Sequence, residues 1–158
     1  MLEKELITTE ILSEWNAWEG KLAALPEYLI TSRRNSQNRT IKQIIGHLID
    51  STANNIMRAI HLQNLPSPLA FPNYATFGNN DRWIAIQNYQ EEDWTSMLQH
   101  LRFSLLHLCH VIRNIDESLL DNQWIAGPDR HITLGEMINM FVPHFKLHLG
   151  EIDELLKD

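Results

Sequence analysis

Two histidines, His144 and His148, have the residue type and spacing that most directly indicate chemistry. They lie four residues apart in a stretch that reads as helix, so both imidazoles leave the same side of that helix, one turn apart. Two donors placed in this way either share one metal ion or serve separately, one packed in the core and one at the surface. The stretch lacks the glutamate of HExxH, which excludes a zincin-type site.

A third histidine, His47, lies far upstream in another helical stretch. At about 100° per residue it falls beside the apolar stripe of that helix, on a polar line with Ser51, Asn54 and Arg58. A histidine used only for packing is expected within the stripe. His47 is therefore either left to solvent or directed at a cleft between helices. Arg58 either faces a substrate anion or makes a contact within its helix or with a loop.

Four segments carry apolar residues at the three- and four-residue spacing of amphipathic helices. Two of them open with capping boxes, which begin at Thr40 and Thr133. We find no strand-like alternation of any length. The sequence therefore predicts an all-α fold, a four-helix bundle that forms a single domain over residues 1–158. The helical segments cover about 3–25, 40–63, 92–115 and 134–156.

The connection between the second and third helices, residues 64–91, is rich in proline and asparagine and contains a short predicted helix over 80–89. A connection of this length is uncommon in a compact domain, and it can cross the length of the bundle. The second helix then runs parallel to the third and antiparallel to the fourth, which is an up-down-down-up order. Within this connection, Tyr74, Phe77 and Trp83 either form an apolar wall at the bundle mouth or serve only for packing.

The antiparallel order brings His47 level with the later histidine pair, because each residue advances a helix by about 1.5 Å. Three neutral imidazoles on two helices can supply three facial ligands and leave coordination positions open. That arrangement is typical of a catalytic metal site and not of a closed structural one. Imidazole suits Zn, Ni, Fe or Cu, so the ligand type alone does not select the metal.

The composition argues against several other functions. The net charge is −7, so no overall field favours nucleic acid, and we interpret Arg33, Arg34 and Arg39 as part of a solvated loop. No apolar run approaches the roughly 20 residues of a membrane span. The N-terminus lacks the apolar core of a signal peptide, so we expect a soluble, cytoplasmic protein. The single cysteine, Cys109, is expected to be a small buried residue and not a nucleophile.

Two stretches, residues 40–51 and residues 133–136 continuing to 144–152, resemble the DinB/YfiT-like superfamily of bacterial metal-dependent enzymes, and the similarity covers nearly the whole chain. The resemblance implies an up-down-down-up four-helix bundle and a divalent metal (Zn, Ni or Fe) held by His47, His144 and His148. Members are described as hydrolases or as transferases that use bacillithiol or mycothiol. A small-molecule substrate, a low-molecular-weight thiol and a homodimer are therefore the expected partners. The alternative is a non-catalytic bundle that acts as a dimeric interaction protein.

Two acidic residues are candidates for a catalytic role beside the histidines. Glu151 stands where the family often has glutamine. It lies three residues after His148, so it either orients an imidazole or accepts a proton, or it is an ordinary surface glutamate. Asp50 follows His47 at the same spacing and is a second candidate. One face of the third helix is interpreted as solvent-exposed or as a dimer surface, with a second metal site as an alternative; it carries His100, Phe103, His107 and His110.

Overall fold

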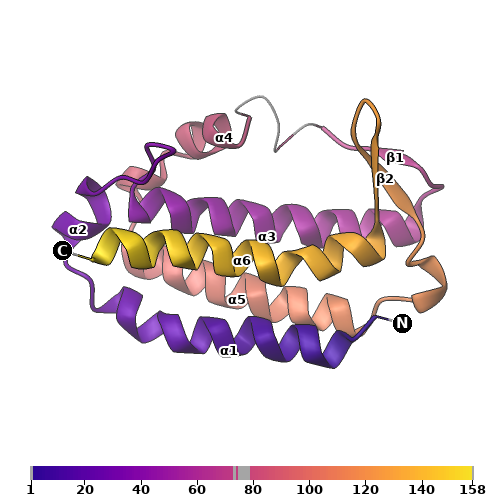
Figure 1. The fold of residues 1–158 in the computed structure, drawn as a ribbon, viewed down its shortest axis with the longest axis horizontal. Helices are drawn as coiled ribbons and strands as arrows, with labels where there is room; N and C mark the ends of the chain where they lie inside the picture. Colours follow the sequence, from indigo (N-terminus) through magenta and orange to yellow (C-terminus); the bar gives the residue numbers. More distant parts are fainter. Residues whose placement is uncertain (1, 73, 75–78, 158) are drawn as a thin grey trace.

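The computed structural model describes residues 2–72, 74 and 79–157. Four long helices form a bundle, as the sequence predicts (Figure 1). They are α1 (Lys4–Ala23), α3 (Ile41–Asn64), α5 (Trp94–Arg113) and α6 (Leu134–Leu156). Helix α3 packs against both α5 and α6, and α1 packs against the same two helices. No helix in the described part of the chain is long and apolar enough to cross a membrane.

The long helices follow the predicted up-down-down-up order. In Figure 1, α1 and α6 run from right to left, whereas α3 and α5 run from left to right. Helix α3 is therefore parallel to α5 and antiparallel to α6. The connection from α3 to α5 passes along the outside of the bundle and contains β1 (Leu69–Ala70), α4 (Asn79–Gln87) and the 3-10 turn η1 (Tyr89–Glu91). The short helix expected in this connection corresponds to α4.

Side-chain caps determine where the two histidine-bearing helices begin. At the start of α3, the Gln43 backbone N–H donates to the Thr40 hydroxyl, and the Thr40 backbone N–H donates to the Gln43 side chain. Thr133 and Glu136 make the same pair of bonds at the start of α6. Each cap contributes roughly 1 kcal/mol. The capping boxes that the sequence predicts are thus both present, and the positions of the histidines follow from them.

One apolar face of each long helix contributes to the core. Cys109 is buried and free, and burial raises the pKa of its thiol to about 11. The thiol is therefore protonated at physiological pH, in agreement with its expected role as a small packed residue. The largest fully buried side chains include Trp15, Leu22, Ile44, Leu101 and Phe145.

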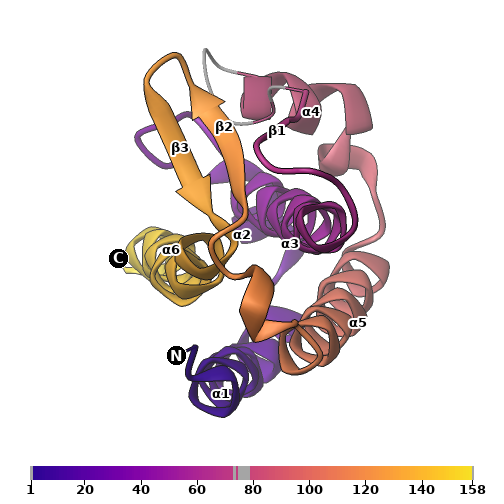
Figure 2. The same ribbon diagram turned by 90° about the vertical axis from the view of Figure 1, so that its right-hand side faces the viewer.

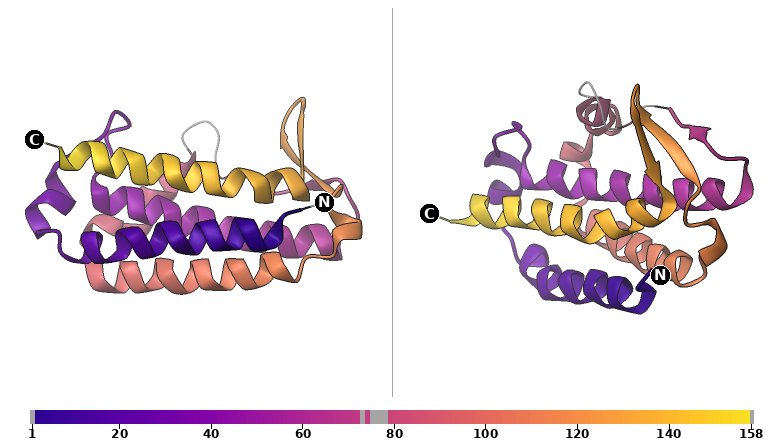
Figure 3. Two further views of the ribbon diagram at one scale, coloured as in Figure 1. Left: turned by 60° about the horizontal axis from the view of Figure 1, so that its bottom comes forward. Right: turned by 45° about the vertical axis from the view of Figure 1, so that its right-hand side comes forward.

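A small sheet that the sequence did not predict stands beside the helical bundle. Strand β2 (Gln123–Gly127) pairs in parallel with β1 and antiparallel with β3 (Arg130–Thr133). Figure 2 shows the β2–β3 hairpin above α3 and α6, and Figure 3 shows the hairpin and α4 on the same side of the bundle. The strands are only two to five residues long. Neither β2 nor β3 alternates between buried and exposed residues, so the period-two pattern that identifies a half-buried strand is missing from both.

Two further short helical segments lie in the other connections. Helix α2 (Glu27–Ser32) lies between α1 and α3, and the 3-10 turn η2 (Glu117–Leu119) lies between α5 and β2. Arg39, which follows α2, is 3% exposed, and this contradicts its interpretation as part of a solvated loop. Its Nε and Nη2 donate to Asp81 Oδ1 at 2.9 and 2.8 Å. The ion pair replaces the solvation that a loop arginine would otherwise need, and it ties the start of α3 to α4.

A glycine on α3 lets the crossing connection approach the helix closely. A Cβ atom built on Gly46 would lie 2.2 Å from Cδ2 of Tyr89. Tyr89 is buried, and its hydroxyl donates to Asp50 Oδ1 at 2.7 Å, one turn further along α3. The contact at Gly46 therefore fixes the end of the connection against the helix that carries His47.

We expect Gly46→Ala to lower the free energy of unfolding by roughly 1–3 kcal/mol, because the added methyl group would overlap the buried Tyr89 ring. Gly20→Ala is the matched control, since nothing lies within 4 Å of a Cβ atom at Gly20. Alanine is favoured over glycine in a helix by about 1 kcal/mol, so the control should be neutral or stabilised. Urea unfolding followed by circular dichroism measures both variants, and equal stabilities would contradict the packing described.

Candidate metal centre

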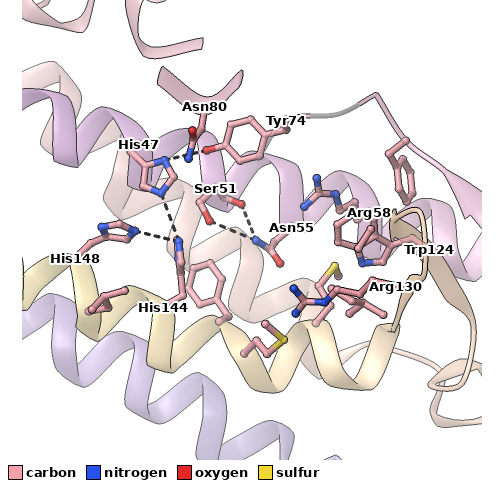
Figure 4. Close-up of a pocket in the computed structure, with 18 of the residues that line it drawn as sticks. His47, Ser51, Asn55, Arg58, Tyr74, Asn80, Trp124, Arg130, His144 and His148 are labelled. Carbon is pink, nitrogen blue, oxygen red and sulfur yellow. Dashed lines mark hydrogen bonds between the residues drawn. The ribbon is translucent and has the colours of Figure 1, made fainter. Parts of the chain in front are cut away.

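Three histidines from α3 and α6 meet in one cluster (Figure 4). His144 Nε2 lies 3.4 Å from His47 Nε2 and 3.1 Å from His148 Nε2. The three nitrogens all lie within 4.8 Å of one another. His47 and His148 are 4% and 5% exposed, and His144 is half-buried. The antiparallel pairing of α3 and α6 therefore brings together the residues that the sequence analysis grouped.

The separations between these nitrogens fit the donor set of a single divalent ion. Zinc bonds histidine nitrogen at about 2.0–2.1 Å. Two nitrogens at that distance, with an angle of roughly 90–110° at the ion, are about 2.8–3.4 Å apart. The two separations on His144 fall in this range. The same two contacts are hydrogen bonds between ring nitrogens, in which the tautomer of each ring decides which nitrogen donates.

Hydrogen bonds on the far side of two rings orient their Nε2 atoms. Glu151 Oε2 lies 2.8 Å from His148 Nδ1. An ionised carboxylate only accepts hydrogen bonds, so His148 Nδ1 carries the proton, and in the neutral ring Nε2 then presents its lone pair to the cluster. The Tyr74 hydroxyl lies 3.1 Å from His47 Nδ1. A carboxylate that accepts a hydrogen bond from the second ring nitrogen is a usual support of a metal-binding histidine.

Two of the histidines are held in the neutral form that binds metals. Burial, and then the charge of His148, lower the pKa of His47 to about 2 and that of His144 to about 4. Arg39 contributes to both shifts in the same direction. Both rings are therefore neutral at physiological pH, and each has one ring nitrogen with a lone pair available.

A cavity of about 700 Å³ opens beside the histidine cluster. Small-molecule sites typically have volumes of about 300–1,000 Å³. Figure 4 shows polar side chains of α3 continuing from His47 along one wall, with the hairpin on the opposite side of the view. The cavity thus joins the histidines to a space large enough for a substrate. Besides the histidines, its lining includes Ser51, Asn55, Arg58, Tyr74, Trp124, Arg130, Phe141 and Glu151.

The two acidic candidates have different positions. Glu151 lines the cavity and contacts His148, and it also accepts a hydrogen bond from Asn35 Nδ2 at 3.3 Å. Asp50 is buried, and its Oδ1 accepts hydrogen bonds of 2.7 Å from both Tyr89 and Gln87. Burial raises the pKa of the Asp50 carboxyl group. The structure thus places Glu151 at the cluster, whereas Asp50 anchors the connection that crosses the bundle.

The remaining candidates divide in the same way. The Tyr74 ring meets the Trp83 ring edge to face at 5.0 Å, so two members of the expected aromatic wall are in contact; Phe77 lies outside the described residues. On α5, Phe103 is 63% exposed. The histidines of that face join no third metal-ligating side chain among the residues that the structure describes. They are His100, His107 and His110.

Sequence reasoning missed the hydroxyl of Tyr74 as a partner of His47, and it missed the part of the cavity wall formed by Trp124. Tyr74 lies 27 residues from His47, and no spacing rule connects them. Trp124 belongs to β2, a strand that was not predicted. A signal for either residue would have required knowledge of how the two long connections fold back onto α3.

The profile of the DinB superfamily matches residues 10–152. The chain belongs to the DinB superfamily. No curated protein matches it. This member has the family's fold, with a buried cluster of three histidines between α3 and α6.

Solved structures with the same fold extend the comparison. YfiT from Bacillus subtilis, a probable metal-dependent hydrolase with an unusual four-helix bundle topology, has a TM-score of 0.81 and 20% identity over 97% of this chain and 85% of its own. A mycothiol-dependent maleylpyruvate isomerase has a TM-score of 0.75 and 12% identity over 96% of this chain and 61% of its own. An uncharacterized protein from Clostridium difficile 630 has a TM-score of 0.73 and 15% identity over 98% and 96% of the two chains. At these identities the similarity establishes the fold.

The lowered histidine pKa values predict how the stability of the metal-free protein depends on pH. Below pH 6.5 the unfolded chain takes up protons at His47 and His144, but the folded chain does not until the pH approaches about 4 or lower. These two histidines therefore leave the free energy of unfolding constant above pH 6.5. Below pH 6.5 they lower it by on the order of 1 kcal/mol per pH unit for each histidine. Urea unfolding between pH 4.5 and 8 should show that the free energy of unfolding falls less steeply with decreasing pH for His144→Gln than for the wild type. Equal slopes for the two proteins would contradict the lowered pKa of His144.

The contact between Glu151 and His148 predicts a graded effect on metal affinity. Glu151→Ala removes the hydrogen-bond acceptor behind the ring and should weaken zinc binding by about 10–100-fold. Glu151→Gln keeps a hydrogen-bond acceptor at this position, so it should lose less zinc affinity than Glu151→Ala does. Glu154→Gln, which changes an exposed carboxylate of the same helix, is the control and should bind as the wild type does. Competition with a chromogenic chelator measures the affinities, and equal values for all the variants would exclude this role of Glu151.

Proposed function

We propose that this protein is a metal-dependent enzyme that acts on a small molecule, with His47, His144 and His148 as the ligands of one divalent ion. The observation that carries the proposal is the convergence of three Nε2 atoms at a cavity of about 700 Å³. A closed structural site would need a fourth protein ligand. Among the described residues, the cluster contains three.

Each residue around the cluster has a part in this proposal. When bound, the ion supplies Lewis acidity, which lowers the pKa of a water or thiol ligand. Tyr74 and Glu151 hold the rings of His47 and His148 in fixed orientations. Glu151 lines the cavity as well, so its carboxylate is also placed to accept a proton from a reacting group. Imidazole ligands are compatible with zinc, nickel and iron.

The relatives suggest two reactions for such a site. YfiT is a probable metal-dependent hydrolase, and the isomerase depends on mycothiol. This chain accordingly catalyses either hydrolysis or the transfer of a group to a low-molecular-weight thiol. The competing proposal is a non-catalytic homodimer in which the bundle serves association. It predicts that no activity is detected with or without metal and that removal of metal leaves the stability unchanged.

Metal content tests the ligand assignment. Protein purified without a histidine tag should contain close to one divalent ion per chain by plasma mass spectrometry. The triple variant His47→Ala, His144→Ala, His148→Ala should contain almost none. The matched control is His100→Ala, His107→Ala, His110→Ala, which removes as many imidazoles from the exposed face of α5 and should keep the metal. Full metal content in the first triple variant would refute the assignment.

Turnover distinguishes the two reactions. The metal-loaded protein is screened against ester, amide and electrophilic substrates with and without bacillithiol or mycothiol. Turnover that needs no thiol indicates hydrolysis, and turnover only with a thiol indicates transfer. Chelation should abolish either activity, and re-addition of the ion should restore it. Activity that survives complete chelation would contradict a metal-dependent reaction.

A further inference from the structure

Arg58 is a buried cation without an anionic partner at the cavity wall. It is 7% exposed and lines the cavity. Its Nε is buried without a hydrogen-bond partner, and no carboxylate of the described residues forms an ion pair with it. Arginines are rarely buried unless they are paired, because removing an ionised group from water is costly. Burial lowers the pKa of the guanidinium, but an arginine remains protonated in proteins.

Aromatic side chains hold this guanidinium in place. Its central carbon lies 4.2 Å from the centre of the Trp124 ring, and 5.9 and 6.0 Å from the centres of Phe71 and Tyr74. Figure 4 shows Arg58 between Tyr74 and Trp124. Stacking uses the face of a guanidinium and leaves the N–H donors at its edge free for a planar or tetrahedral anion. Trp124 thus supports the group without neutralising it.

The charges around the cavity have the opposite sign to those of the whole chain. The net charge of the protein is −7. The described residues that line the cavity include three arginines, Arg39, Arg58 and Arg130, and one carboxylate, Glu151. Glu151 is engaged by His148, and Arg39 is engaged by Asp81. The field at the Arg58 end is therefore positive, which favours an anionic ligand.

We propose that Arg58 binds an anionic group of the substrate, a carboxylate or a phosphate, while the reacting part of the same molecule lies at the three histidines. This inference rests on the proposed function. Arg58 lies 11 residues after His47 on α3, or on the order of 16 Å along the helix axis. Helical side chains lean toward the N-terminus, so the guanidinium lies closer to the histidines than its backbone does. The substrate is then an elongated anion whose middle lies beside Ser51 and Asn55 of α3 and near the rings of Tyr74 and Phe141.

Calorimetric titration of metal-free protein tests this anion site separately from the metal. The probes are phenylacetate, phenyl phosphate and the neutral phenylacetamide. The wild type should bind at least one of the two anions roughly tenfold or more tightly than the amide, the size expected for a charge-assisted hydrogen bond. The anion that binds more tightly identifies carboxylate or phosphate as the preferred group. This comparison needs no variant, so it does not depend on whether a variant folds.

Variants then assign the effect to Arg58. Arg58→Gln should abolish the preference for the anion, and Arg58→Lys, which keeps the charge but loses the planar fork, should keep part of it. Arg102→Gln removes the same charge from an exposed position on α5 and should behave as the wild type. Equal binding of anions and amide by the wild type, no binding of either anion, or an unchanged preference in Arg58→Gln would overturn the proposal. Metal content is measured on the same samples, so an absent metal and an absent anion site give different results.

Discussion

The antiparallel contact between α3 and α6 is the constraint on which the candidate site depends. Each helix alone presents histidines along its side, but only their pairing brings three Nε2 atoms to within 4.8 Å of one another. His144 Nε2 makes hydrogen-bond contacts with the other two rings, at 3.4 Å to His47 Nε2 and 3.1 Å to His148 Nε2. The packing of Ile44, Leu48, Phe145 and Leu149, all buried on these two helices, fixes the helices and with them the positions of the three rings. The core therefore keeps three ring nitrogens close enough together to share one cation.

The other end of the cavity favours a negatively charged group. Arg58 is buried on aromatic rings, and no carboxylate in the part of the chain that the structure describes forms an ion pair with it. A folded protein normally pairs such a group, so its isolation is itself a cost to stability. The two ends together describe a polarised cavity, in which one end favours a cation and the other an anion. The unpaired guanidinium lowers stability, as is common where binding takes priority.

The parts of this architecture that the sequence predicted are those governed by local rules. Helical periodicity located α1, α3, α5 and α6, and the capping boxes at Thr40 and Thr133 gave the starting points from which His47, His144 and His148 could be compared. The length of the connection then gave the direction of each helix. The spacing of Glu151 from His148 suggested their contact, because residues three apart share a helix face.

The parts that were missed depend on contacts between segments far apart in the chain. Arg39 was misread because its partner, Asp81, is 42 residues away. The hairpin β2–β3 was missed because its strands are short and only partly buried. Tyr74 and Trp124 reach the cavity through connections whose path no periodicity reveals. Local patterns thus indicated the ligand cluster, whereas the cavity wall required the folded connections.

The separation between ligands and wall has a consequence for how such proteins diversify. The histidines lie on long helices whose positions are set by the core, but much of the cavity wall belongs to the crossing connection and the hairpin. Substitutions, insertions or deletions in those connections can reshape the space beside the cluster without moving α3 against α6. The cavity can then change in shape and charge while the histidine cluster is kept unchanged. One helical bundle can in this way present differently shaped cavities beside the same three histidines.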